Sequence, residues 1–286
     1  MEGYVERQGG VSMPGKSVLL IGPPGSGKTT MAALTAVRRP VHFLDIDRKI
    51  ASMENVKPLI ESNDVTFWEL DEPLIEGGLK ERARELGSSR KPAKSPLGWP
   101  KFSQQCEALD REAEAKRAGT WVVDSMTRLG EHLMRYILFS DEKGISTMSP
   151  RDWGAWLSIW QETVTILVDA AKQQDKDIIF TVHERVSEIP GPNTKIRYSY
   201  EGNQKQREYI GMLDVKIAAS LGGQVGIQIG SYFEEVYGLS VELDEKSDMP
   251  KWVCRVVPDG RRDLRTSFKV SKAEFPPDFK IIWGGK

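Results

Sequence analysis

The segment over residues 22–29 constrains most what this chain can fold into. It reads Gly-Pro-Pro-Gly-Ser-Gly-Lys-Thr and fulfils the phosphate-binding-loop pattern at every fixed position. The apolar run before it, residues 17–21, predicts a strand, and the residues after it predict a helix over 28–37 that ends before Pro40. A glycine-rich loop between a strand and a helix presents backbone N–H groups and a helix N-terminus to phosphate oxygens. The pattern therefore predicts a nucleoside triphosphate site.

The residues of this loop have separate expected roles. Lys28 is expected to reach the β and γ phosphates, and Thr29 to place its hydroxyl on Mg²⁺. The alternative, a glycine-rich turn with a structural lysine, requires every fixed position and both flanks to coincide by chance. Nucleotide contacts are expected from Gly22, Pro23, Pro24, Gly25, Ser26, Gly27, Lys28, Thr29 and Thr30.

Composition narrows the class of protein. The chain has 286 residues, of which 39% are hydrophobic and 28% charged, as in an ordinary soluble protein. Its net charge of −1 argues against general coating of nucleic acid but permits a local basic segment. The sequence shows neither an apolar run of membrane-spanning length nor the apolar core of a signal peptide at its start. A cytoplasmic location is expected, in the host cytoplasm if the chain is virus-encoded.

Apolar strands alternate with helical stretches through about the first 185 residues, which predicts an α/β fold with a mainly parallel sheet flanked by helices. Trp153, Trp156 and Trp160 share the apolar stripe of one helix, so we expect them in the core. Alternating residues over 237–243 and 252–256, followed by a turn and residues 261–268, predict a C-terminal antiparallel hairpin extension. The other predicted segments are strands at 41–47, 65–70, 121–124 and 177–183 and a surface loop at 87–100.

We therefore predict one domain in three parts. Residues 1–15 form an N-terminal arm, residues 16–225 the nucleotide-binding core, and residues 226–286 the antiparallel extension and tail.

Two acidic strand ends are candidates for metal and water chemistry. Asp124 ends an apolar strand and would hold the Mg²⁺ shell through water, unless it caps the following helix. The next residue is Ser125 instead of glutamate, so a hydrolytic enzyme needs its base elsewhere. Asp45 or Asp47 can supply the base if their strand lies beside the phosphate-loop strand. We choose Asp47, whose alternative role is to cap a helix at residues 50–53.

A histidine ends the strand predicted at 177–183. His183 would contact the γ-phosphate or the attacking water and so report the nucleotide state. The alternative is a hydrogen-bonded structural histidine.

Together these motifs resemble the RecA-like recombinase and ATPase core. The resemblance rests on the phosphate loop, Phe-Leu-Asp-Ile-Asp at 43–47, Val-Val-Asp-Ser at 122–125 and the polar end of the 177–183 strand. Within this class the chain is most similar to the short RecA-like ATPases of bacteriophages linked to single-strand annealing and recombination. That similarity rests on Thr-Val-His-Glu at 181–184 and Arg-Asp-Leu-Arg-Thr at 262–266. By the resemblance, Asp47 matches the family's catalytic glutamate with one methylene fewer.

The resemblance also implies two loops that face DNA, at about residues 127–152 and 184–212. In the second, cations can pair with phosphates and aromatic rings can stack on unpaired bases, which suits single-stranded nucleic acid. The alternative is an exposed hairpin whose lysines serve solubility and whose tyrosines pack on the sheet. The candidate DNA-binding residues are Lys195, Arg197, Tyr198, Tyr200, Lys205 and Arg207.

A cation near the C-terminus is expected to complete the site of a neighbouring subunit. By resemblance to related assemblies, Arg265 would reach the γ-phosphate bound there, where charge accumulates during phosphoryl transfer. The alternative is a cross-strand partner for Asp263 or Glu242.

The predicted function is that of a RecA-like ATPase that uses ATP and Mg²⁺ and binds single-stranded DNA in recombination, annealing or replication. The sequence holds no guanine-reading Asn-Lys-x-Asp motif, which favours ATP. Expected partners are single-stranded DNA, further copies of this chain in a ring or filament, and a single-strand-binding protein, but no membrane. Two alternatives stay open: a nucleotide or small-molecule kinase, and an ATP-gated regulator or loader with little hydrolysis.

Overall fold

The computed structural model describes most of the chain. The predicted N-terminal arm, apart from its last residue, and most of the predicted surface loop at 87–100 lie outside the described residues, and residues 98–100 of that loop are helical. The described ranges are 15–37, 39–70, 98–140, 148–190, 195–201, 204–210, 213–221, 228–244, 247–259, 261–270 and 272–283.

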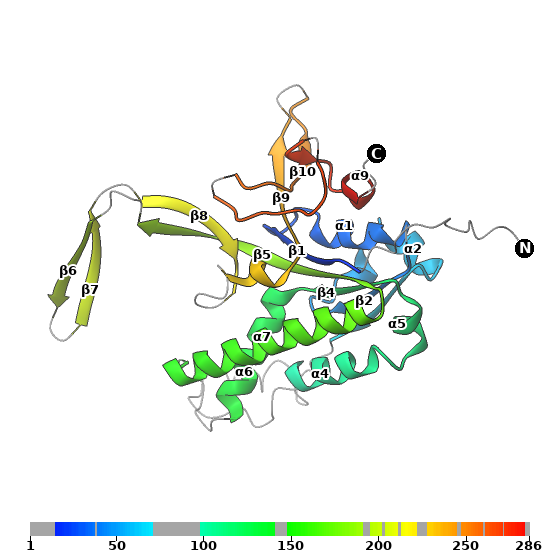
Figure 1. Ribbon diagram of the computed structural model, residues 1–286, viewed down its shortest axis with the longest axis horizontal. Helices are drawn as coiled ribbons and strands as arrows, with labels where there is room; N and C mark the ends of the chain where they lie inside the picture. Colours follow the sequence, from blue (N-terminus) through cyan, green and yellow to red (C-terminus); the bar gives the residue numbers. More distant parts are fainter. Residues whose placement is uncertain are drawn as a thin grey trace, which may run out of the picture.

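A mainly parallel sheet forms the centre of the molecule (Figure 1). Within the described residues it has nine strands in the order β11-β10-β9-β1-β5-β4-β2-β3, with β8 paired to β5. The central strands are buried on both faces, which explains why the sequence shows them as continuous apolar runs. The expected α/β class is therefore confirmed. The strands are β1 (Ser17–Gly22), β2 (Val41–Asp45), β3 (Val65–Glu69), β4 (Thr120–Asp124), β5 (Asp177–Pro190), β8 (Leu213–Ala219), β9 (Glu235–Leu243), β10 (Pro250–Arg255) and β11 (Glu274–Phe275).

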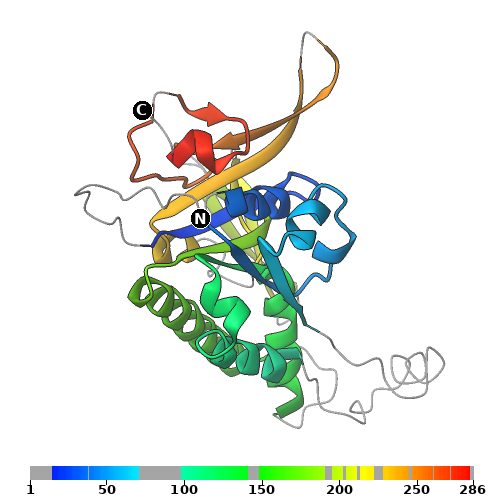
Figure 2. The same cartoon turned by 90° about the vertical axis from the view of Figure 1, so that its right-hand side faces the viewer.

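Helices cover both faces of the sheet (Figures 1 and 2). One face carries α1 (Lys28–Leu34), η1 (Thr35–Val37), η2 (Ile50–Ser52), α2 (Lys57–Glu61) and α9 (Phe279–Trp283). The other carries α4 (Gly98–Ala108), α5 (Ala113–Arg117), α6 (Met126–Ser140), α7 (Pro150–Gln173) and the short η3 (Ile229–Tyr232). Of these helices, none in the described part of the chain has the length and apolarity that a bilayer crossing needs.

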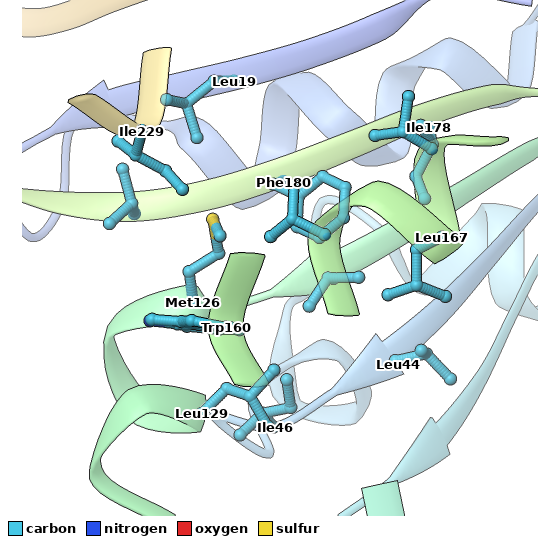
Figure 3. Close-up of a cluster of buried hydrophobic side chains, with 14 of the residues drawn as sticks. Leu19, Leu44, Ile46, Met126, Leu129, Trp160, Leu167, Ile178, Phe180 and Ile229 are labelled. Carbon is cyan, nitrogen blue, oxygen red and sulfur yellow. The ribbon is translucent and has the colours of Figure 1, made fainter. Parts of the chain in front are cut away.

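The larger core lies between the sheet and helices α6 and α7 (Figure 3). Trp156 and Trp160 are fully buried there, and Trp153 packs against the same cluster. Their edge-to-face ring contacts, with centroids 5.8 and 5.9 Å apart, run along α7, and Trp156 Nε1 donates to the carbonyl oxygen of Gly130 on α6 at 3.1 Å. The prediction that these tryptophans are core residues is confirmed.

The prediction of a DNA-facing loop at about residues 127–152 is wrong, because most of its described residues are helical. Residues 126–140 form helix α6, and α7 begins at Pro150. Leu129, Leu133 and Ile137 recur at helical spacing and are buried, so packing against the sheet explains the helix. Ser149 then caps α7, because its hydroxyl accepts from the Asp152 N–H while the Asp152 carboxylate accepts from the Ser149 N–H.

The C-terminal strands are antiparallel as expected, but the predicted hairpin is paired differently. β10 pairs with β9, which sets Trp252 opposite Val241, and with β11. Residues 261–268, all described, join the sheet through one bridge between Arg265 and Val236. The Asp259 carboxylate accepts from the N–H groups of Arg261 and Arg262, so the chain curls where the turn was predicted, but the residues after it bridge to β9 instead of pairing with β10.

A long β arm projects from one end of the sheet (Figure 1). Strand β5 continues past the sheet and pairs antiparallel with β8 from Glu184↔Ala219 to Pro190↔Leu213. Beyond them, β6 (Lys195–Glu201) and β7 (Gln204–Ile210) form a separate hairpin. We call residues 184–190, 195–201, 204–210 and 213–219 the β arm.

Candidate functional site

The phosphate loop joins β1 to α1 as the motif predicts. Gly25 has φ 78° and Gly27 has φ 87°, a left-handed conformation that side-chain-bearing residues rarely adopt. Gly22 packs directly on β9, since an added Cβ would lie 2.4 Å from the carbonyl oxygen of Leu239. The glycines therefore let the backbone curl tightly and keep it against the neighbouring strand.

Lys28 lies across this loop. Its Nζ donates to the carbonyl oxygens of Gly22 and Pro23, each at 2.9 Å. Burial lowers the pKa of Lys28 to about 8, although the nearby Asp124 acts in the opposite direction. A phosphate oxygen would offer this buried ammonium a charged partner in place of two carbonyls.

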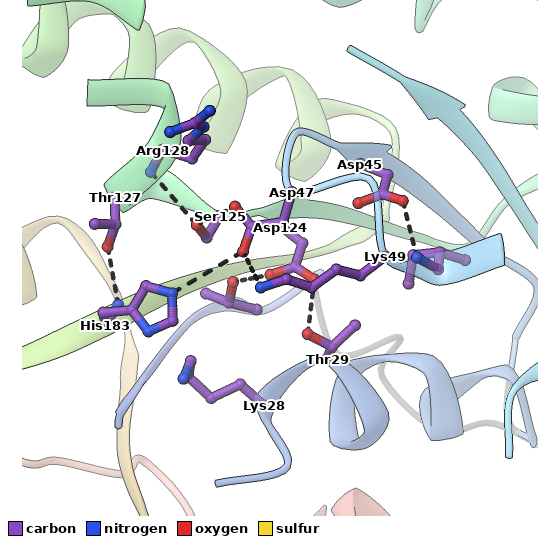
Figure 4. A network of polar contacts seen from close by, with 12 residues as sticks. Lys28, Thr29, Asp45, Asp47, Lys49, Asp124, Ser125, Thr127, Arg128 and His183 are labelled. Carbon is purple, nitrogen blue, oxygen red and sulfur yellow. Dashed lines mark hydrogen bonds and ion pairs between the residues drawn. The ribbon is translucent and has the colours of Figure 1, made fainter. Parts of the chain in front are cut away.

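Asp124 and two hydroxyl groups form a compact oxygen cluster (Figure 4). Thr29 Oγ1 donates to Asp124 Oδ2 at 2.7 Å, and Thr181 Oγ1 donates to Asp124 Oδ1. Burial raises the pKa of Asp124, while the two hydroxyl hydrogen bonds act against that rise. Hard oxygen donors of this kind are the ligands that Mg²⁺ prefers, so the predicted pair of Thr29 and Asp124 fits that ion.

Asp47 lies at the site although its strand, β2, is not a neighbour of β1 in the sheet. Strands β5 and β4 lie between β2 and β1, so the condition set for Asp47, neighbouring strands, is not met. The chain instead turns after β2, where the N–H groups of Ile46 and Asp47 donate to the carbonyl oxygen of Asp124 at 2.6 and 3.1 Å. That turn carries Asp47 to the cavity wall.

The other acid of the pair, Asp45, stabilises this turn through a hydrogen bond to its backbone. It is fully buried, and its Oδ2 accepts from the N–H of Ile50 at 2.9 Å. Burial raises the pKa of Asp45 to about 6. Because Asp45 supplies the hydrogen bond at the start of η2, the capping alternative for Asp47 is not what the structure shows.

Asp47 is surrounded by polar groups. Its Oδ1 accepts from Ser125 Oγ at 3.0 Å, its Oδ2 accepts from Lys49 Nζ at 2.8 Å, and His183 Nε2 is 4.0 Å from Oδ2. The main-chain N–H of His183 donates to Thr127 Oγ1 at 2.9 Å. Burial, followed by the charge of Lys28, lowers the pKa of His183, which favours the neutral ring near pH 7.

Lys28, Thr29, Asp47, Asp124 and His183 line one cavity of about 940 Å³, a size suited to a small-molecule ligand. Trp252, on β10, closes one side of it, with Nε1 donating to the carbonyl oxygen of Gly25 at 3.2 Å. The predicted residues that line the cavity are Pro24, Gly25, Gly27, Lys28, Thr29, Thr30, Asp47, Asp124 and His183.

Three contributors were missed by sequence reasoning. Thr181 stands two residues before His183 on the same strand, and Lys49 stands two residues after Asp47. In each case the distance of two residues from a predicted site residue was a signal that sequence reasoning could have used. Trp252 came with no local signal, since its strand reaches the loop only through the pairing of β10 with β9.

The structure places Arg265 elsewhere. Its Nη2 donates to the carbonyl oxygens of Gly230 and Phe233 in the same chain. Glu242, one of its two alternative partners, pairs with Arg255 instead. A reach from Arg265 to a neighbouring subunit would require these contacts to break, and it stays a prediction.

The candidate DNA-binding residues lie on strands of the β arm. Lys195, Arg197, Tyr198 and Tyr200 belong to β6, and Lys205 and Arg207 belong to β7. The register sets Tyr198 opposite Arg207 and Tyr200 opposite Lys205. The segment expected as a loop is thus an ordered hairpin at the far end of the arm (Figure 1).

Comparison with known proteins gives similarities to a protein family and to solved structures. The model of a family described as an AAA domain matches residues 15–236. A solved structure, that of a KaiC-like protein from the hyperthermophilic archaeon Pyrococcus horikoshii OT3, is similar at a TM-score of 0.40 and 14% identity, covering 92% of this chain and 85% of that chain. No curated protein sequence matches the chain.

Proposed function

This chain belongs to the AAA domain family, with the fold of a phosphate-loop ATPase, and we propose that it binds ATP with Mg²⁺ and hydrolyses it to ADP and phosphate. The observation that carries the proposal is the convergence of Lys28, Thr29, Asp124 and Asp47 on one cavity. The residues come from three separate stretches of the chain, and each has the chemistry that one part of a phosphoryl transfer needs.

The side chains divide this work by position. Lys28 would exchange its two carbonyl acceptors for phosphate oxygens, and Thr29 with Asp124 would hold Mg²⁺, which neutralises phosphate charge when bound. Asp47 would orient the attacking water with one carboxylate oxygen. Ser125 fixes that carboxylate from the other side through Oδ1.

Steady-state hydrolysis tests this assignment. Asp47→Ala should lower kcat by about 100-fold while leaving ATP affinity nearly unchanged, because its role is to position water. Lys28→Ala should abolish nucleotide binding, and Glu54→Ala, an exposed acid near α2, is the matched control. Unchanged turnover in Asp47→Ala would support a regulator with little hydrolysis, and turnover only with an added phosphate acceptor would support a kinase.

We further propose that the β arm binds single-stranded DNA for recombination, annealing or replication, and that copies of the chain assemble on it. Cations and tyrosines stand opposite one another on β6 and β7, a composition suited to phosphates and unpaired bases. Strand β5 also supports the proposal, because it carries His183 at the cavity and then continues into the arm. A change at the γ-phosphate would therefore act on the same strand that holds the arm.

Binding of a fluorescent oligothymidine at low salt tests the arm. The double variant Arg197→Glu with Lys205→Glu should weaken binding by at least about tenfold, since two phosphate contacts become repulsive. Arg111→Glu with Lys116→Glu makes the same charge change, at one exposed residue before α5 and one within it, and should bind as the wild type does. Loss of binding in both double variants would indicate a general charge effect instead of a site on the arm.

A further inference from the structure

A second lysine, Lys49, reaches into the phosphate end of the cavity from the turn after β2. The base of this side chain is held firmly. Arg48 adopts a left-handed backbone with φ 56°, Asp45 binds the N–H of Ile50, and the carbonyl of Asp124 binds the N–H of Asp47. The backbone at Lys49 is therefore pinned on both sides, so the long side chain is the part free to change position.

The ammonium of Lys49 lies among the groups that surround the expected γ-phosphate. Figure 4 shows the side chain extended past Thr29, with its Nζ directed to Asp47 and lying near Asp124. Its charge acts on Asp124, on Lys28 and on His183. Burial lowers the pKa of Lys49, but its hydrogen bond to Asp47 and its attraction to that carboxylate outweigh burial and raise the pKa, so Lys49 stays charged.

The two members of the Lys49–Asp47 ion pair differ in solvent exposure. The Lys49 side chain is 56% exposed, whereas the Asp47 side chain is 10% exposed. The lysine can therefore leave the pair by rotating its flexible stem, while the carboxylate is held by Ser125. Both Asp47 oxygens accept a hydrogen bond in this arrangement, and departure of Lys49 would free a further acceptor position on Oδ2 for a water.

We propose that Lys49 is a cation switch, which pairs with Asp47 when the site is free of nucleotide and moves to the γ-phosphate oxygens when ATP binds. A terminal phosphate carries more negative charge than one carboxylate and offers several acceptor oxygens, so it competes well for the ammonium. The move frees Asp47 Oδ2 for the attacking water and brings a positive charge to the transferring group. This inference rests on the proposed ATP hydrolysis.

The switch also gives the site a cation from its own chain. The neighbour's Arg265 was predicted to supply that charge, yet its guanidinium binds carbonyl oxygens of its own subunit. With Lys49 in place, hydrolysis by the isolated chain does not require a second copy to deliver the cation.

Substitutions at Lys49 test the switch with two readouts, turnover and the ratio of ATP affinity to ADP affinity. Lys49→Met should lower kcat by about 100-fold, the loss typical of one preorganised charge in a transition state. It should also reduce the preference for ATP over ADP while leaving ADP affinity unchanged, because only ATP has the phosphate that Lys49 contacts. Lys49→Arg keeps the charge and should retain part of the turnover. Lys57→Met, an exposed lysine on α2, is the matched control.

The outcomes separate this inference from the proposed function. A wild-type protein that does not bind ATP overturns both. Wild-type turnover with unchanged turnover in Lys49→Met overturns the switch alone, and so does faster turnover, which would mean that Lys49 only restrains Asp47. If the wild type binds ATP without hydrolysing it, an unchanged preference for ATP over ADP in Lys49→Met and Lys49→Arg overturns the switch, and a reduced preference in Lys49→Met supports it.

Discussion

Removing the hydroxyl of Thr181, by Thr181→Val, should destabilise the charged form of Asp124 relative to its neutral form. The carboxylate is 2% exposed and accepts one hydroxyl hydrogen bond on each oxygen, from Thr29 and from Thr181. Thr181→Val keeps the shape of the side chain and removes one of these bonds. A hydrogen bond to a charged group contributes about 1.5–3 kcal/mol, which corresponds to about 1–2 units in the pKa of the carboxyl. We expect the variant to lose about 2 kcal/mol of unfolding free energy where Asp124 is charged.

The loss should depend on pH with a defined sign. Burial already holds the folded pKa of Asp124 above its unfolded value, so the stabilisation linked to this group is lost as pH rises through the folded pKa. The substitution raises that pKa further and therefore costs most at alkaline pH. Below the folded-state pKa of Asp124 in both the wild type and the variant, the carboxyl is neutral and the substitution costs less unfolding free energy.

Urea unfolding of the nucleotide-free protein at about pH 8 and about pH 5 measures this difference. The matched control is Thr163→Val on α7, where the hydroxyl binds the carbonyl of Ile159 in its own helix and no titrating group is involved. Thr163→Val should show the same effect at both pH values. An equal loss of unfolding free energy in Thr181→Val at both pH values, or a larger loss at low pH, would show that the Thr181 hydroxyl does not stabilise the charged form of Asp124.

Further predictions concern the phosphate loop and its cover. Burial gives Lys28 a pKa of about 8, and bound phosphate favours the charged ammonium, so ATP affinity measured by calorimetry should fall about tenfold between about pH 7 and about pH 9; a constant affinity would contradict this. Gly22→Ala should lower the thermal midpoint more than Gly25→Ala, because it places a Cβ against the Leu239 carbonyl oxygen. A Cβ at residue 25 has open space, so Gly25→Ala costs only the strain of a positive φ, about 1–2 kcal/mol. Equal midpoints would show that β9 shifts to accommodate the added Cβ at no cost in stability. Trp252 is 47% exposed and bonded to the loop, so nucleotide should change tryptophan emission in the wild type and far less in Trp252→Phe; an equal change in both would place the reporter elsewhere.

The sequence predicted best the features that are local. The phosphate loop, the buried strands and the acids at their ends depend on patterns of a few neighbouring residues, and the structure brings Lys28, Thr29 and Asp124 together. Helix α6 was missed where the resemblance, instead of the spacing of Leu129 and its apolar neighbours, decided the prediction.

What sequence could not give is the order in which strands lie side by side. Asp47 reaches the cavity through a turn that is bonded to Asp124, although two strands separate β2 from β1. Thr181 contacts Asp124 because β5 lies beside β4, and Trp252 covers the loop because β10 pairs with β9. Each contact joins residues distant in the chain, which leaves no local pattern from which to predict it.

Steady-state ATP hydrolysis with and without single-stranded DNA at low salt, with Lys28→Ala as the blank, tests most directly whether this chain is a DNA-dependent ATPase. We expect Mg²⁺-dependent turnover that rises when single strands are added and is lost in the blank. Turnover that ignores DNA, together with no retention of DNA in a gel shift, would contradict the role of the β arm. Absence of any turnover above the Lys28→Ala blank would contradict the proposed ATPase itself.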